Sequence, residues 1–253
     1  MSGADTMPIE DYLAQGGKLT SPDNVPPRYR GELMRLMATF VDSELAGAAG
    51  FAETINDAPG IKQRIAASRI VLEKLDHAER VLDIMGTFGA DTSRYANHHP
   101  WTARLRRESD LGAARHGSDM RLAVFHYPLE GWLDAVVMNV LMGSASVIQI
   151  EEFSGVSYQP LAEAFRAILP RERRHVELGV EGLRAILADA ARMPDVVTAV
   201  SYWRPRVAAS FGAGASSRFE TQKRFGLRQT PNDRLASRWS ADMDALLGEM
   251  RIA

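Results

Sequence analysis

The sequence predicts an all-α protein, a four-helix bundle with additional C-terminal helices. Apolar residues recur at steps of three and four in each long segment, and no segment shows the alternation typical of strands. Glu172 and His175 are three residues apart, so on a helix they point the same way and can hold one metal ion together. Glu44 precedes His77 by 33 residues (77 − 44), and Gly143 precedes His175 by 32 (175 − 143), which suggests a duplicated helical hairpin.

Length and composition describe one ordinary globular domain of 253 residues. A formal charge of −2 and a hydrophobic share of 45% argue against a nucleic-acid binder and against a disordered chain. The sequence has no cysteine, which excludes disulfides, thiolate metal sites and cysteine nucleophiles. A metal site would therefore be built from glutamate, aspartate and histidine.

The N-terminal stretch 1–27 mixes Gly, Pro, Asp and Ser and ends in a Pro-Pro pair. We expect it to form an arm that lies on the surface or is ordered against a partner, while residues 28–253 form the bundle domain. The start of the chain has no basic region followed by an apolar run, so we do not expect a secretory signal. These features favour a cytoplasmic protein.

The first helical hairpin is predicted from two apolar-periodic segments, 29–55 and 61–88. Glu44 lies at the edge of the first apolar stripe, where a carboxylate is costly unless it is paired or binds a cation. His77 lies in the second segment, and Lys74 occupies the position where a Glu-x-x-His pair would have its glutamate. Glu73 could act as a substitute ligand, although a supporting or solvent-facing role fits it better.

Between residues 89 and 117 the helical periodicity lapses, and basic residues gather around Trp101: Arg104, Arg106, Arg107, Arg115 and His116. Arginine forks match phosphate oxygens, so this stretch could bind an acidic cofactor or a substrate phosphate. A solvated loop is the alternative interpretation.

The second hairpin is predicted over two further segments, 132–153 and 158–188. The first is apolar enough to resemble a membrane span, but Asp134, Asn139 and Gln149 interrupt it, so we expect a buried bundle helix and no membrane association. The second carries Glu172 and His175, with Pro170 expected to kink it or to cause a local bulge. Segments 193–211 and 235–250 predict the additional C-terminal helices.

Several short motifs keep a characteristic relative spacing along the chain: Pro27-x-Tyr29-Arg30, Ser43-Glu44, Ala58-Pro59, His77, Phe125-His126-Tyr127-Pro128, Trp132, Ser157-Tyr158-x-Pro160, Glu172-x-x-His175, Trp203-x-Pro205 and Phe211-Gly212. Through these motifs the chain resembles the catalytic-subunit branch of the phenylacetyl-CoA epoxidase family, the ferritin-like di-iron oxygenases of phenylacetate catabolism. The resemblance covers most of the chain, from about residue 25 to residue 248.

The resemblance implies a ferritin-like bundle with metal ligands at four positions: Glu44, His77, Glu172 and His175. It also implies a homo-oligomer such as a dimer, or a heteromer with a homologous subunit, and a reductase as a further partner. Two positions depart from the family pattern. Lys74 stands where the family has the glutamate of its first Glu-x-x-His, and Gly143 stands where it has the carboxylate of its third bundle helix.

These departures change the charge of the expected site. Four carboxylates neutralise two divalent irons, but only Glu44 and Glu172 remain here, and Lys74 adds a positive charge when protonated. A second divalent cation would leave uncompensated buried charge, which costs several kcal/mol. We therefore expect at most one metal ion, iron or alternatively manganese, on Glu44, His77, Glu172 and His175. The alternative is no metal, with Lys74 bridging the two glutamates.

The sequence therefore favours an oxygenase-type enzyme that hydroxylates or epoxidises a small aromatic or acyl-CoA-thioester substrate in a cavity beside Gly143. Lys74, Glu44 and Glu172 are the candidate catalytic residues, with Lys74 as a proton donor. Two alternatives remain open. One is a non-catalytic, metal-free structural subunit that partners an active homologue, and the other is a metal-independent acid–base enzyme that uses Lys74.

Overall fold

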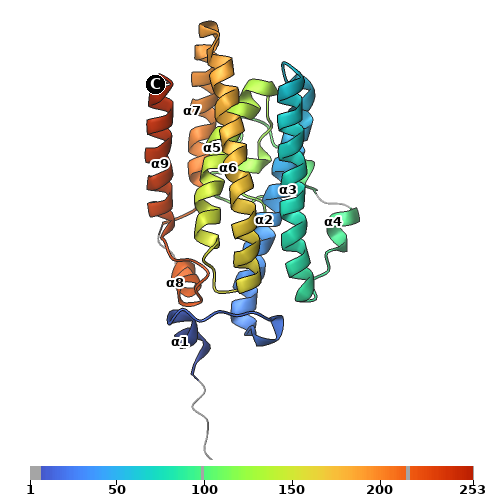
Figure 1. The fold of residues 1–253 in the computed structure, drawn as a ribbon, viewed down its shortest axis with the longest axis vertical. Helices are drawn as coiled ribbons and strands as arrows, with labels where there is room; N and C mark the ends of the chain where they lie inside the picture. Colours follow the sequence, from blue (N-terminus) through green and yellow to red (C-terminus); the bar gives the residue numbers. More distant parts are fainter. Residues whose placement is uncertain (1–6, 98–99, 215–216, 253) are drawn as a thin grey trace, which may run out of the picture.

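The computed structural model describes residues 7–97, 100–214 and 217–252, and the described part of the chain contains helices and no strand. Four long helices form a ferritin-like bundle (Figure 1): α2 (Pro27–Thr54), α3 (Ile61–Thr87), α5 (Gly131–Phe153) and α6 (Gln159–Leu187). Helix α2 packs along α3 and α5 along α6, with α3 also against α6. The prediction of an all-α bundle built from two helical hairpins is confirmed.

Helix α5 is the buried helix of the bundle, since side chains on most of its circumference are covered. Among the described residues it is the one helix long and apolar enough to span a membrane, and 72% of its most apolar window is buried inside the protein. Burial among α2, α6 and α7 accounts for this apolar character.

Helix α6 carries Pro170 in its interior and continues through it from Gln159 to Leu187. The expected local bulge is absent, because the whole described span of α6 is α-helical. Both members of the Glu-x-x-His pair therefore lie on one continuous helix just after the proline.

The predicted C-terminal helices are α7 (Met193–Ala209) and α9 (Asn232–Glu249), and both pack against α5. Three short helices were not predicted: α1 (Ile9–Ala14), α4 (Ser93–Asn97) and α8 (Ser217–Arg224). They have five to eight residues each, too few for a helical apolar period to be recognised.

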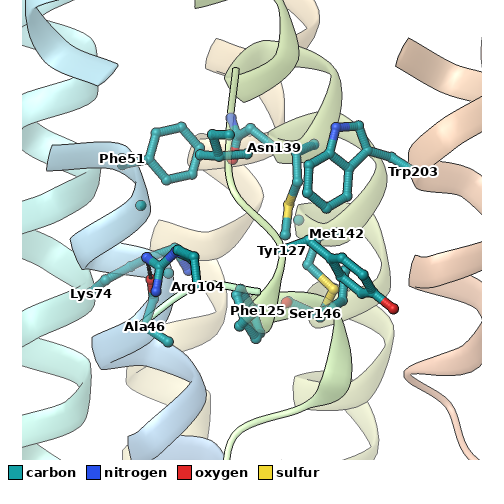
Figure 2. Close-up of a pocket in the computed structure, with 16 residues that line it drawn as sticks. Ala46, Phe51, Lys74, Arg104, Phe125, Tyr127, Asn139, Met142, Ser146 and Trp203 are labelled. Atoms are coloured by element: carbon teal, nitrogen blue, oxygen red, sulfur yellow. Dashed lines mark hydrogen bonds between the residues drawn. The ribbon is translucent and has the colours of Figure 1, made fainter. Parts of the chain in front are cut away.

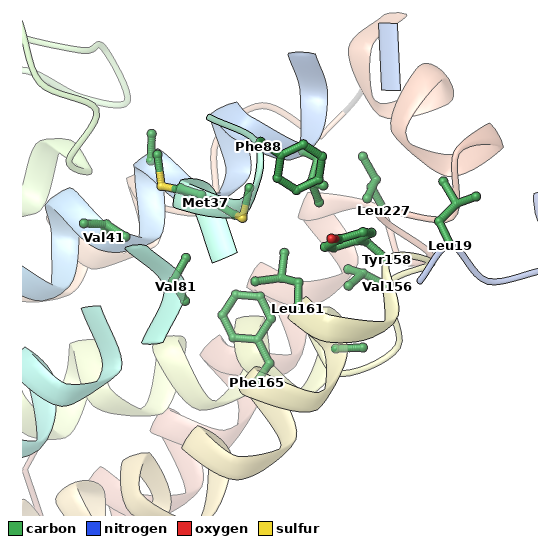
Figure 3. Close-up of a cluster of buried hydrophobic side chains, with 14 of the residues drawn as sticks. Leu19, Met37, Val41, Val81, Phe88, Val156, Tyr158, Leu161, Phe165 and Leu227 are labelled. Atoms are coloured by element: carbon green, nitrogen blue, oxygen red, sulfur yellow. The ribbon is translucent and has the colours of Figure 1, made fainter. Parts of the chain in front are cut away.

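Two large apolar clusters and a small one around Phe51 and Ile70 fill the described part of the protein. One large cluster joins α2, α3 and α6 around Met37, Val81 and Phe165 (Figure 3), and the other joins α5, α7 and α9 around Trp203 and Trp239. The N-terminal arm contributes to the first cluster. Its side chains Leu13 and Leu19 are buried there, so the described part of the arm packs on the bundle of its own chain.

The arm is also held by backbone hydrogen bonds. The Leu19 N–H donates to the Ser157 carbonyl at 2.8 Å, and the Gln159 N–H donates to the Leu19 carbonyl at 2.8 Å. In Figure 3, Leu19 lies beside Tyr158 and Leu227, which come from distant parts of the chain. The Tyr29 hydroxyl and the Ser157 hydroxyl share a buried hydrogen bond of 2.8 Å. This end of the bundle thus joins four segments in one contact region.

Candidate functional site

The predicted site residues converge in the centre of the bundle. Glu44 comes from α2, Lys74 and His77 from α3, and Glu172 and His175 from α6, and all five are buried. Helical spacing explains this arrangement, because residues three apart on α3 and on α6 face the same side of their helices. The sequence prediction that these side chains share one site agrees with their positions in the structure.

Lys74 lies between the two glutamates. Its Nζ is 3.0 Å from Glu44 Oε1 and 3.0 Å from Glu172 Oε1, and the residue is only 7% exposed. The predicted bridge by the Lys74 ammonium is confirmed. The stem of Lys74 packs against Gly47, where a Cβ would lie at an ordinary contact distance of 3.6 Å from Lys74 Cδ. Burial alone would lower the pKa of Lys74, but the charges of Glu172 and Glu44 raise it above its ordinary value.

His77 faces the same two carboxylates. Its Nδ1 is 3.2 Å from Glu44 Oε2 and 3.2 Å from Glu172 Oε1. Burial by itself would lower the pKa of His77, yet the hydrogen bonds to Glu172 and Glu44 raise it above its ordinary value. With Lys74 and His77 both protonated, two positive charges balance the two carboxylates.

Glu172 contacts three basic side chains of the site, those of Lys74, His77 and His175. Burial alone would raise its pKa, but the Lys74 ammonium and the hydrogen bonds from His175 and His77 hold the pKa well below its ordinary value. One of its oxygens, Oε2, is buried and has no hydrogen-bond partner among the described residues, and the same holds for His77 Nε2. Unpaired buried polar atoms of this kind are uncommon in folded proteins.

His175 is oriented by two carboxylates. Its Nδ1 is 3.2 Å from Glu172 Oε1, and its Nε2 is 2.7 Å from Oε2 of the partly exposed Glu73. Glu73 therefore supports His175 and does not reach the two glutamates as a substitute ligand. The sequence favoured a supporting or solvent-facing role for Glu73. It did not identify His175 as the partner, because that contact depends on side-chain directions that residue spacing alone does not give.

Helix α5 packs closely against α6 at Gly143, the position at which the resembled family has a carboxylate. A Cβ added at Gly143 would lie 3.0 Å from Val176 Cγ2 and 3.6 Å from Asn139 Oδ1, so α6 approaches this point closely. Asn139 donates from Nδ2 to the His175 carbonyl at 2.9 Å, and Gly179 leaves the space that this amide occupies. Helices α5 and α6 are therefore in direct contact at this point.

The cavity expected beside Gly143 exists but is small. Its volume is about 30 Å³, and its lining includes Lys74, Asn139 and Met142 (Figure 2). This volume holds about two water molecules. The predicted cavity beside Gly143 is therefore present but is too small for the aromatic substrate expected there, because Phe125 and Met142 line it closely and Val176 packs against Gly143. A second cavity of about 240 Å³ has Glu44 in its lining.

The basic residues around Trp101 do not form one anion site. Arg107 makes a two-pronged ion pair with Asp134 at 2.8 and 2.9 Å, and its guanidinium lies 3.7 Å from the Tyr202 ring centre. Arg104 donates to backbone carbonyls, including that of Ala46 at 3.3 Å. These two arginines fasten the 89–117 segment to the bundle, whereas Arg115 lines the 240 Å³ cavity.

The bundle centre offers donor atoms of the kind that a divalent metal binds. Among the described residues, one group of side chains has ligand atoms within 4.8 Å of one another: Glu44, His77 and Glu172. Two carboxylates and an imidazole, with a free oxygen on Glu172, fit a single divalent ion if the Lys74 ammonium moves aside. They do not fit two irons, since the ammonium lies between the only two carboxylates of the group and α6 closes position 143. His175 supports Glu172 from outside this group.

The bundle, with its buried carboxylate–histidine group at the centre, defines an all-α protein of the ferritin-like class. The model of the family described as "Phenylacetic acid catabolic protein" matches residues 13–253, most of the chain, and the protein belongs to this family. The chain is also similar to one of the subunits of 1,2-phenylacetyl-CoA epoxidase from Escherichia coli (strain K12), with 23% identity over 178 residues. This match covers 70% of the chain and 53% of that relative, so it spans about half the relative's length.

Proposed function

We propose that this protein is an oxygenase-type enzyme whose bundle site holds at most one metal ion and acts on a small aromatic or acyl-thioester substrate. The observation that carries the proposal is the group formed by Glu44, His77 and Glu172, with its ligand atoms within 4.8 Å of one another. Membership in a phenylacetic acid catabolic family supports the reaction class. The similar protein in Escherichia coli is named as a phenylacetyl-CoA epoxidase subunit, which suggests the kind of substrate.

Glu44, His77 and Glu172 would hold the ion, with iron preferred and manganese as the alternative. A redox-active iron held by these residues would pass electrons from an external reductant to dioxygen. Lys74 is the proton-holding group nearest to the two carboxylates, and Glu73 keeps His175 directed at Glu172. Phe125 and Met142 form apolar walls beside this region.

A metal-free structural subunit is the second candidate, and the Lys74 bridge favours it. The ammonium touches both glutamates, and together with a protonated His77 it balances their charge without an ion. Such a chain would serve as the partner of a catalytic homologue. The acid–base alternative has less support, because a raised pKa keeps the Lys74 ammonium protonated at neutral pH and so makes it a poor proton-transfer group.

Elemental analysis of protein expressed separately with iron and with manganese tests these functions. We expect one ion per chain for the enzyme, together with oxygen consumption when a reductant and phenylacetyl-CoA are supplied. A chain without metal that instead forms a complex with a catalytic homologue would support the structural role. Two ions per chain would contradict the charge argument and indicate an ordinary di-iron centre.

A further inference from the structure

The larger cavity has a composition that the metal site does not explain. It has a volume of about 240 Å³ and lies between α2, α5 and the segments around α8 and α9. Its lining reaches Glu44 together with Phe125 and Met142, and includes Phe40 and Phe153. The cavity therefore combines aromatic walls with contact to one carboxylate of the buried site.

Four arginines line this cavity: Arg35, Arg115, Arg218 and Arg228. Glu44 is the one carboxylate in the lining, and it already accepts a hydrogen bond from Lys74. Arg35 and Arg115 lie on the exposed side and form no ion pair with the described residues. Arg218 is paired with Glu32, whereas Arg35, Arg115 and Arg228 form no ion pair with the described residues, so the walls carry an excess of positive charge.

Arg228 is the strongest indication of a ligand. It is 8% exposed, and its guanidinium donates to Gln149 Oε1 at 2.7 Å and to Asn232 Oδ1. Both partners are neutral amides, and among the described residues no carboxylate lies within ion-pair distance of Arg228. A buried cation without an opposite charge is costly, and its guanidinium fork matches the oxygens of an oxyanion.

Arg218 provides an independent observation on another segment of the lining. Its Nε donates to Glu32 Oε2 at 3.0 Å, whereas its Nη2 is buried and has no hydrogen-bond partner among the described residues. Since Arg218 and Arg228 come from different segments, a ligand that reached both would be held from two sides.

We propose that the 240 Å³ cavity binds a small organic oxyanion, with a carboxylate or phosphate group on these arginines and an apolar body against Phe40 and Phe153. The cavity lining continues to Glu44, so the far end of the ligand points toward the buried site. This binding needs neither a metal ion nor turnover. It can therefore fail or succeed independently of the proposed oxygenase function.

Binding to the purified full-length chain, measured by calorimetry, tests the proposal. The probes are phenylacetate as the carboxylate, phenyl phosphate as the phosphate, and phenylacetamide as a neutral molecule of similar shape. At least one anion should bind about ten-fold or more tightly than phenylacetamide, because each lost charge-assisted hydrogen bond costs about 1.5–3 kcal/mol. The better of the two anions identifies the oxyanion.

Arg228→Gln and Arg115→Gln should each weaken anion binding about ten-fold, and Arg64→Gln should leave it unchanged. Arg64 is an exposed control on α3, outside the cavity, that donates to the Asn56 carbonyl. If the variant at the buried Arg228 does not fold, the variant at the exposed Arg115 still tests the proposal. The proposal would be overturned if the amide bound as tightly as the anions, or if no anion showed saturable binding at millimolar concentration. Unchanged anion binding in a folded Arg228 or Arg115 variant would overturn it as well.

Discussion

At the scale of single residues, Lys74 decides what the bundle centre can bind. Its ammonium separates two buried carboxylates that would otherwise face each other. Lys74→Ala should destabilise a metal-free protein by about 3–5 kcal/mol, since it removes one partner of a buried ion pair and leaves uncompensated charge. Chemical denaturation measures the change. Lys62→Ala, an exposed change on the same helix, should alter stability by less than about 0.5 kcal/mol. Equal effects of the two substitutions would show that the bridge contributes no stability.

Lys74→Glu should raise the metal content. This substitution restores a third carboxylate and removes the positive charge, so the site would carry enough negative charge for a more tightly held ion or for a second one. Elemental analysis should give more iron per chain than in the wild type, with Lys62→Glu as the control for added surface charge. An unchanged metal content would mean that position 74 does not govern ion binding.

The pH dependence of stability should reflect two groups with opposite signs. Glu172 has a pKa below its ordinary 4.5 in the folded protein, so its contribution is present above that pH and is lost as pH falls through the depressed value. His77 has a pKa above its ordinary 6.5, so its contribution is complete below that pH and is lost as pH rises through the raised value.

Denaturation midpoints measured from about pH 3 to about pH 9 test these signs. Glu172→Gln should flatten the loss of stability on the acid side, and His77→Gln should flatten the loss on the alkaline side. If the His77 variant instead gained stability relative to the wild type as pH fell below 6.5, the sign assigned to this histidine would be wrong.

The sequence predicted which side chains would meet, because helical spacing fixes the face on which each residue lies. It did not predict that Glu73 would hold His175 or that Asn139 would bond to the His175 carbonyl. Those contacts depend on rotamers and on the close approach of α5 to α6, which Gly179 permits. No sequence pattern marked Arg228 as a candidate binding residue, since it is buried beside residues that are distant in the chain.

At the scale of elements, the long helices followed from apolar periodicity, and the short helices α1, α4 and α8 did not. Helix α3 retains a stripe that the fold leaves uncovered: Ile61, Ile65, Leu72 and Leu75, which are 75%, 57%, 68% and 44% exposed. Steps of four, seven and three residues place these side chains on one side of the helix. An uncovered apolar stripe on a straight helix suits another helix as its partner.

We expect two copies of the chain, or this chain and a homologous partner, to associate through this face of α3. Light scattering should show an oligomer for the wild type, and Ile65→Glu combined with Leu72→Glu should produce a monomer that keeps its helical content. Arg166→Glu on the exposed face of α6 is the matched control and should leave assembly intact. A wild-type chain that is monomeric at high concentration would count against association of two copies through this face, and a monomer that is active by itself would count against a structural-subunit role.

At the scale of the whole molecule, the positions of the cavities could not be predicted. The small residues at Gly143 and after it suggested space beside α5, but Val176 and Phe125 fill most of it. The larger cavity is enclosed by several separate segments, and its volume is what their side chains leave unfilled. Sequence periodicity assigns residues to the interior and does not measure how completely they occupy it.

The backbone hydrogen bonds that Leu19 forms with Ser157 and Gln159 can form only late in the synthesis of the chain on the ribosome. The backbone partner at residue 157 follows Leu19 by 138 residues (157 − 19), which at about 5–20 residues per second takes roughly 7–28 seconds to translate. During this interval Leu13 and Leu19 lack the surface that covers them in the finished protein. We therefore expect the nascent N-terminal arm to dock only after the second helical hairpin has begun to emerge.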